Sequence, residues 1–354
     1  MSATTDRTRR PRRTWAAAAL AVVVVAGLLH GYRNTNVLTA DRLCAGLVPA
    51  AGADAVLPGT GRLDAERNGP DDGPVDTECT IEKSSVLVGG GRGRLTVRIV
   101  EERGDFAFLD GSWSDPARAS FLSGPVTGGF QEHDGWVALP ERCWTDEPVF
   151  VRAHSTEPVP DTAALSALLT DVARTVAQEE GCGTLPERPG APRPPRSDPP
   201  RPADERRLCD LDDLPVRGLV PAGSKVLDTG QSAPAGLWSC TVFLDEEPGR
   251  PARADGYVTY AAARDPLLLA AVAKSPGTHR RTAADGTESA VVGPWRTVLP
   301  CGDGGGLYLA MESGLQYVEA RERVPNTPDR DVLFRAFQRA ATASFDCDRG
   351  SAGE

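Results

Sequence analysis

The sequence has few of the residues that bind metals or carry out nucleophilic catalysis. Only four of its 354 residues are histidines, and no two of them are spaced as H-x-x-x-H. None of its cysteines has the C-x-x-C spacing of a zinc ribbon. The sequence also has no G-x-S-x-G elbow and no phosphate-binding loop ending in Gly-Lys-Ser/Thr. We therefore expect no metal, no cofactor and no catalytic residue, and we predict that the protein is not an enzyme.

Positive charge is also in short supply. The formal net charge is -10, with 39 basic against 49 acidic residues, and only three of the basic residues are lysines. Nucleic-acid binding requires concentrated positive charge, which this chain has only near its N-terminus and in one proline-rich stretch. The composition therefore predicts no nucleic-acid partner.

The N-terminus has the pattern of a membrane-directed segment. Five arginines between residues 7 and 13 precede an uncharged run at residues 15–29, and Arg33 follows it. Fifteen helical residues rise only ~22 Å, so the adjoining residues 30–32 are needed to approach a ~30 Å hydrocarbon core. That length fits either a removed signal peptide or a retained anchor. We favour the anchor: a cytoplasmic basic stub at 1–14, a transmembrane signal-anchor at 15–32 and an extracytoplasmic remainder, which places the protein in the cell membrane as a single-pass chain.

The eight cysteines fall into two matching sets of four. The steps between them are 35, 64 and 39 residues in the first set and 31, 61 and 46 in the second. An even number of cysteines placed alike in two halves predicts two disulfide-stapled copies of one domain in an oxidising compartment. Three pairings are open in each copy, and we prefer neighbours in the chain. The predicted disulfides are Cys44 with Cys79, Cys143 with Cys182, Cys209 with Cys240, and Cys301 with Cys347.

A proline-rich stretch divides the two sets. Residues 184–207 contain eight prolines among charged residues and show no apolar periodicity. Such a composition favours an extended polyproline II spacer that separates two globules without fusing their cores. The predicted organisation is therefore a first copy at 41–183, a linker at 184–207 and a second copy at 208–348, each copy folding and moving independently.

Both copies show the same order of predicted elements. In the first, a short helix at 115–122 and a long amphipathic helix at 161–178 accompany strands at 75–83, 93–102, 126–130, 135–141 and 148–154. In the second, helices at 265–274 and 329–345 accompany strands at 237–245, 253–262, 289–299, 307–312 and 315–322. The pattern predicts an α+β fold in which two tandem antiparallel sheets are each covered by a C-terminal helix, with one N-terminal transmembrane helix in addition.

Tryptophans are the remaining candidates for ligand contact. Most lie near a cysteine, and Trp136 and Trp295 precede Cys143 and Cys301 by similar distances, which favours packing in the core. Trp113 has no counterpart in the second copy. We therefore single out Trp113 as the one tryptophan expected to face a ligand.

The arrangement resembles a known class of exported domains. A basic stub, one apolar segment, an early Leu-Cys, a cysteine on a strand (Glu78-Cys79-Thr80 and Ser239-Cys240-Thr241) and a late cysteine pair are similar to actinobacterial envelope-exported domains, often lipoproteins. No cysteine follows the apolar run directly, so this chain departs from the lipoproteins in lacking the acylation site. The resemblance implies extracytoplasmic α+β domains and no catalytic residues.

We expect a membrane-anchored binding or interaction protein of the cell envelope, with a protein or small molecule as partner. The alternatives are a secreted hydrolase acting on cell-wall material and a structural envelope component without a ligand.

Overall fold

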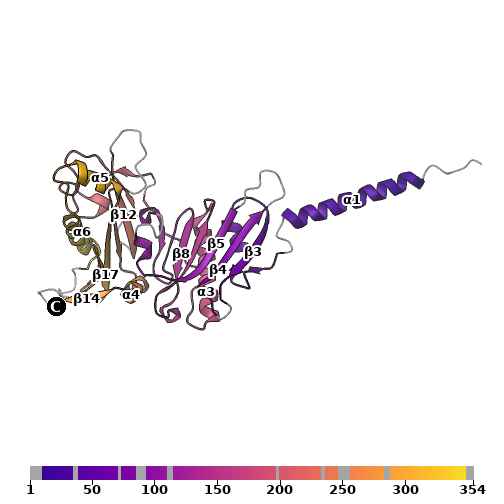
Figure 1. Ribbon diagram of the computed structural model, residues 1–354, viewed down its shortest axis with the longest axis horizontal. Helices are drawn as coiled ribbons and strands as arrows, with labels where there is room; N and C mark the ends of the chain where they lie inside the picture. The colour runs from indigo at the N-terminus through magenta and orange to yellow at the C-terminus, as the bar shows by residue number, and fades with distance from the viewer. Residues whose placement is uncertain are drawn as a thin grey trace, which may run out of the picture.

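Two antiparallel sheets and the helices packed on them make up the protein (Figure 1). The computed structural model describes residues 10–34, 39–70, 73–84, 93–109, 115–196, 199–232, 236–245, 256–282 and 288–347. We call residues 41–183 the first half and residues 208–348 the second half.

The first half is built on a seven-stranded sheet with the order β3-β4-β5-β9-β8-β7-β6. Its strands are β3 (Arg62–Asn68), β4 (Thr77–Ser84), β5 (Gly93–Glu101), β6 (Ser120–Leu122), β7 (Gly128–Phe130), β8 (Asp134–Ala138) and β9 (Val149–Ser155). A two-stranded ribbon, β1 (Arg42–Leu43) with β2 (Val48–Pro49), and the helix α2 (Ala50–Val56) precede the sheet. Short 3-10 turns η1 (Phe106–Phe108), η2 (Pro116–Arg118) and η3 (Glu141–Cys143) connect the strands.

The sheet of the second half repeats this order as β11-β12-β13-β17-β16-β15-β14 and gains one edge strand, β10, from the proline-rich segment. Its strands are β10 (Arg201–Pro202), β11 (Val226–Gly230), β12 (Leu237–Leu244), β13 (Val258–Ala263), β14 (His279–Thr282), β15 (Glu288–Gly293), β16 (Arg296–Pro300) and β17 (Gly306–Ser313). The turn η4 (Leu208–Asp210) and the helices α4 (Pro266–Lys274), α5 (Leu315–Arg323) and α6 (Arg330–Ser344) complete it. The mixed architecture with antiparallel sheets is the one that the sequence predicts.

The final helix of each half packs on its sheet through the predicted apolar stripe. In α3 (Thr162–Glu179), Asp161 caps the first turn through Ala163 N–H at 2.8 Å, and the buried face includes Leu165, Leu169 and Val172. In α6, Leu333 and Phe337 are fully buried, and Phe337 stacks on Trp238 with ring centroids 6.2 Å apart. Both helices therefore bury one face at three- and four-residue spacing.

Three local predictions are wrong. Residues 289–299, predicted as one strand, form the hairpin of β15 and β16, because Gly293-Pro294 favours a turn. Residues 315–322 form the helix α5 rather than a strand, because Gln316 places its side chain between the N–H and C=O of Leu244 and fixes the first turn there. Residues 115–122 form only the turn η2 followed by β6. Trp295 also differs from Trp136: Trp136 is buried on β8, whereas Trp295 lies in the turn between β15 and β16 with a φ of 52°.

The expectation of two independent globules is also wrong. One apolar cluster takes members from both halves, so that Phe108 and Phe121 of the first half lie in the same core as Tyr308 and Val272 of the second. The rings of Phe108 and Tyr308 are 5.8 Å apart. The prolines do not keep the linker apart from the cores either, since Leu185 is buried in the shared cluster and Ala203 packs against the second one.

Buried acidic side chains reinforce this shared core. Asp265 caps α4 and accepts hydrogen bonds from Ser123 Oγ and Thr127 Oγ1 of the first half, both at 2.8 Å. In return, Asp105 of the first half, which is fully buried, pairs with Arg296 at 3.0 Å and accepts from the Tyr308 hydroxyl at 3.3 Å. Each half thus contributes a buried carboxylate that bonds to residues of the other half as well as to its own.

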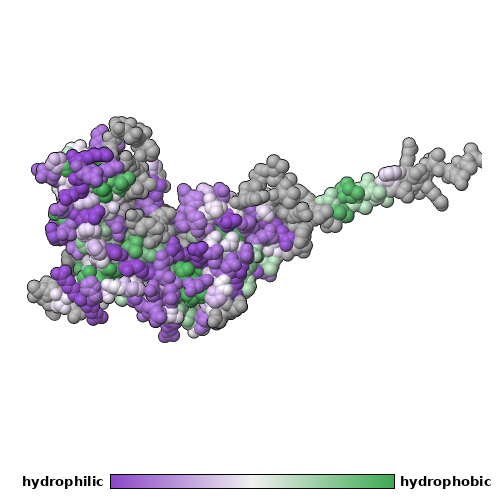
Figure 2. Space-filling view, viewed as in Figure 1, coloured by the Kyte–Doolittle hydropathy of each residue, from purple (hydrophilic) through white to green (hydrophobic). Residues whose placement is uncertain are grey.

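The N-terminal apolar segment forms the helix α1 (Arg10–Asn34), which extends away from the two sheets (Figure 1). Its described side chains are exposed, Trp15 among them, and they colour as hydrophobic in Figure 2. Within the part of the chain that the structure describes, no helix has both the length and the apolarity needed to cross a membrane. The predicted transmembrane helix is therefore not supported by the structure.

Candidate functional site

All eight cysteines are oxidised in the pairs that the sequence predicts. The disulfides are Cys44–Cys79, Cys143–Cys182, Cys209–Cys240 and Cys301–Cys347. The first and third join the start of each half to the equivalent strands β4 and β12, and the other two attach the end of the final helix. Trp113, the predicted ligand contact, lies outside the described residues.

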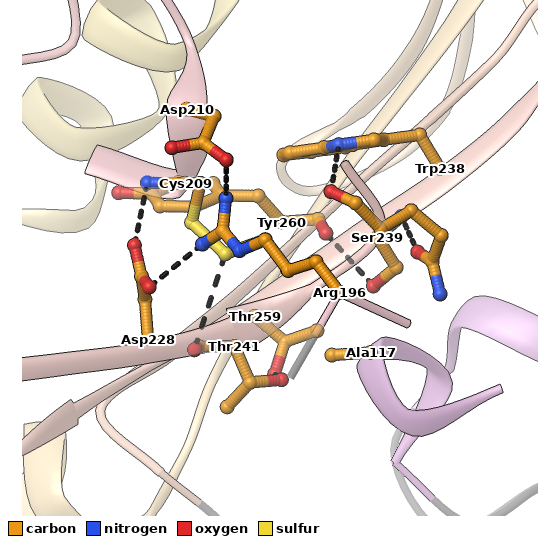
Figure 3. The surroundings of a disulfide bond; sticks show 12 residues. Ala117, Arg196, Cys209, Asp210, Asp228, Trp238, Ser239, Thr241, Thr259 and Tyr260 are labelled. Atoms are coloured by element: carbon orange, nitrogen blue, oxygen red, sulfur yellow. Dashed lines mark hydrogen bonds and ion pairs between the residues drawn. A yellow bond between two sulfur atoms is a disulfide. The ribbon is translucent and has the colours of Figure 1, made fainter. Parts of the chain in front are cut away.

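A buried charged cluster surrounds the Cys209–Cys240 disulfide (Figure 3). Asp228 on β11 is 1% exposed, and one of its oxygens accepts the N–H of Cys209 at 2.9 Å. Cys209, Cys240 and Asp228 bring three possible metal-ligand atoms close together. Both sulfurs are joined in the disulfide, and neither can provide the thiolate that a metal ligand must be. We therefore interpret this cluster as structural.

Arg196 of the proline-rich segment enters this cluster from outside the second half. Its side chain is 7% exposed and forms ion pairs with Asp210 and with Asp228, the latter at 2.7 Å. Its backbone N–H donates to Gly230 O at 2.8 Å. Removing one partner of a buried pair leaves the other charge uncompensated, so Arg196 fixes the segment to the second sheet.

The fixed segment continues as the edge strand β10 and then forms one wall of a groove. Arg201 and Pro202 pair with Asp228 and Leu227, and Ala203 N–H donates to Val226 O at 3.0 Å. Farther along, Val216 N–H donates to Glu205 O at 2.9 Å, which ties the segment to the loop after η4. The predicted spacer is therefore partly a strand and partly a wall of a binding surface.

The groove has a volume of about 1280 Å³. Its apolar lining comes mainly from two stretches, with residues such as Pro202, Pro215, Val216, Val220 and Val226. Charged side chains of both signs border it, namely Glu205, Arg206, Arg217, Lys225 and Asp245. A mostly apolar concavity with a few convergent polar groups is the usual form of a binding site.

The titratable side chains of the groove's described lining are the carboxylates Glu205 and Asp245, one lysine and two arginines. No histidine or cysteine is among its described lining residues, and Ser224 provides its single hydroxyl. In the first half His154 does lie 2.9 Å from Asp134, but its side chain is 62% exposed. The neighbouring Ser155 is fully buried and donates to Glu157 O, so it cannot act as the nucleophile of that pair.

Burial keeps a tyrosine of the second core protonated near neutral pH. Burial raises the pKa of Tyr260, and its proximity to Tyr257 raises it further. The Tyr260 ring packs 4.6 Å from Phe337 in the second core. This tyrosine therefore serves packing rather than proton transfer near neutral pH.

Sequence reasoning missed Arg196, Asp210 and Asp228. The proline-rich stretch is predicted only as a spacer, and its composition does not single out Arg196. Asp210 binds both Arg196 and Arg201. The available signal was Asp228, a single acidic residue on a strand beside the Cys209–Cys240 disulfide. A buried carboxylate at such a position requires a basic partner.

Comparisons with known proteins returned nothing: no family model, no curated protein and no solved structure matches the chain. The geometry of the groove is therefore the basis for assigning a function.

Proposed function

We propose that this chain is an exported binding protein of the cell envelope and that it holds its ligand in the groove between the proline-rich segment and the second half. The groove is the observation that supports this proposal. It combines an apolar lining with charges of both signs, and one of its walls is the proline-rich segment held by the Arg196–Asp228 ion pair. Such a lining suits an elongated ligand with an apolar body and charged groups, such as a peptide.

Four disulfides support the exported location, since such bonds persist in oxidising compartments. We further propose that α1 tethers the protein to the cell membrane, with the basic stub inside and the C-terminal bulk extracytoplasmic. Retention of the full chain in the membrane pellet after alkaline carbonate extraction would support the tether. Recovery of a soluble chain lacking residues 1–32 would contradict it.

Binding in the groove can be tested with 8-anilinonaphthalene-1-sulfonate, a fluorescent probe with an apolar body and one anionic group. The full chain should enhance its fluorescence, and Ala222→Trp should reduce the enhancement by filling the groove. Lys225→Glu should do the same by removing an attractive charge. The matched control is Lys274→Glu, because Lys274 is an exposed lysine of the same half that lies on α4, outside the groove lining.

Equal probe binding by all four proteins would refute the groove as the site. Further experiments distinguish the two alternative functions, a cell-wall hydrolase and a structural envelope component. Release of soluble fragments from purified cell-wall material would favour a hydrolase. Wild-type behaviour of cells carrying Ala222→Trp, with a defect only when the protein is absent, would favour a structural component.

A further inference from the structure

A second surface of the second half has the features of a protein interface. Outside α1, the exposed large hydrophobic side chains of the described residues all lie on or beside α5 and α6: Leu315, Val318, Val324 and Val332, each 39% to 45% exposed. Figure 2 shows a hydrophobic patch at the end of the molecule where Figure 1 places α5. Single exposed apolar residues are ordinary, but Val318 and Val332 line the same concavity, whereas Val324 lines a different one. Exposed apolar side chains that share a concavity indicate an interaction surface.

Aromatic and arginine side chains form the centre of this surface. The Arg330 guanidinium lies 4.8 Å from the ring centroid of Trp295 and 5.3 Å from that of Tyr317. The Trp295 indole N–H donates to Asp331 Oδ1 at 2.9 Å, which holds the ring against the start of α6. Tryptophan, tyrosine and arginine are the residues that dominate binding energy at protein interfaces.

These groups surround a concavity of about 530 Å³ that is also lined by Val318 and Val332. Trp295 adopts a φ of 52°, a conformation that is unfavourable for a bulky side chain. The surrounding contacts must offset this strain. A ring that only shielded the core from solvent would not need a strained backbone.

The charges around the concavity are balanced. Its lining contains three arginines (Arg321, Arg330 and Arg335) and three carboxylates (Glu322, Asp329 and Asp331). Arg321 and Asp329 pair with each other at 3.0 Å. Among the described residues, Arg330, Arg335 and Glu322 form no ion pair, so groups of both signs are left for a partner.

A balanced surface of this kind fits a second copy of itself. In a two-fold interface the same surface is used by both copies, so a residue of one copy contacts a different residue of the other, and the reverse contact forms as well. Such a surface must be self-complementary in charge and apolar at its centre. A strongly acidic or strongly basic partner would leave one sign unmatched. The face also points away from the first half in Figure 1, so packing within the chain leaves it accessible.

We propose that the α5–α6 face is a self-association surface through which two copies of this chain form a symmetric dimer. The inference does not depend on the groove, because the groove's described lining residues do not include Trp295, Arg330 or Arg335. The first half has no helix between β9 and α3, so it offers no second version of this surface.

The test compares full-length variants in one mild detergent by sedimentation over a concentration series, so that α1 is the same in every sample. Wild-type protein should dimerise. Arg335→Glu and Glu322→Arg should each weaken the dimer by ~10-fold or more in Kd, because like charges then face each other. An equimolar mixture of the two variants should regain dimers, since each reversal then meets an opposite charge.

A photo-crosslinking residue at position 332 gives an independent readout, with the same residue at exposed position 66 of the first half as control. The proposal predicts a product of twice the chain mass from position 332 alone. A monomeric wild type, dimers that survive in both charge variants, or a mixture that fails to recover would each overturn it. Crosslinking from position 332 only to a different protein would also overturn it and would assign the face to that partner.

Discussion

Arg196 and Asp228 form a buried ion pair, 2.7 Å between Nη2 and Oδ1, that joins the proline-rich segment to the sheet of the second half. The pair lies directly beside the Cys209–Cys240 disulfide (Figure 3). It therefore connects the covalent frame of the second half to the segment that forms the groove wall.

Asp228→Ala should destabilise the protein by up to about 3–5 kcal/mol, because the buried Arg196 then keeps only Asp210 as a carboxylate partner and the Cys209 N–H loses its acceptor. Urea denaturation followed by tryptophan fluorescence measures this loss. The double variant Arg196→Met with Asp228→Leu should recover most of it, leaving about 1–2 kcal/mol for the unpaired N–H of Cys209. If Asp228→Ala alone proves neutral, the pair has no role in fixing the segment.

Asp265→Ala should lower the free energy of unfolding by about 3 kcal/mol, because it removes the α4 cap and the bonds to Ser123 and Thr127 together. The wild-type chain should unfold in one transition, since its halves share a core. Exposed Asp212→Ala is the control and should change stability by no more than about 0.5 kcal/mol. Two well-separated wild-type transitions would contradict the shared core.

Replacing Cys143 and Cys182 with alanine should cost about 4 kcal/mol on the chain-entropy model, because the bridge closes a loop with a sequence separation of 39. The final helix of the first half should then exchange its amide protons faster than α6 does. Hydrogen exchange detected by mass spectrometry distinguishes the two helices. Unchanged exchange in α3 would show that packing alone holds it.

Alkaline pH should destabilise the fold. Burial raises the pKa of Tyr260 and of Tyr308 above the ordinary value of 10.0, so the folded state keeps these hydroxyls protonated when the unfolded chain releases them. Stability from this source is complete below about pH 10 and declines as the pH rises further. Urea midpoints measured on both sides of pH 10 test this, and Tyr260→Phe should reduce the decline.

Features that depend on local spacing were predictable from the sequence. Leu165, Leu169 and Val172 repeat at helical intervals, and α3 buries them. Matched cysteine spacing led to the correct disulfide pairs. The sequence could not reveal that Gly104 lies against the backbone of Ala271, where a β-carbon would approach to 2.2 Å, because this contact joins residues far apart in the chain.

The candidate site was unpredictable for a related reason. Its wall comes from a proline-rich stretch whose composition is typical of a spacer, and the contacts that fix it, the buried Arg196 and the pairing of β10 with β11, are visible only in the structure. The helix α5 was misread as a strand because its decisive contact, Gln316 with Leu244, spans 72 residues. Long-range polar contacts of this kind leave no periodic trace in the sequence.

The shared core sets an order of events for a chain that emerges N-terminus first. Gly104 N–H donates to Ser275 Oγ, a contact spanning 171 residues. The interface of the first half is therefore covered only after most of the chain has been synthesised. Until α4 arrives, Phe108 and Phe121 face water on a sheet that is otherwise complete and already stapled by its own two disulfides. Synthesis therefore passes through an intermediate whose apolar interface surface is exposed to water. A chain interrupted before residue 265 would remain in that aggregation-prone state.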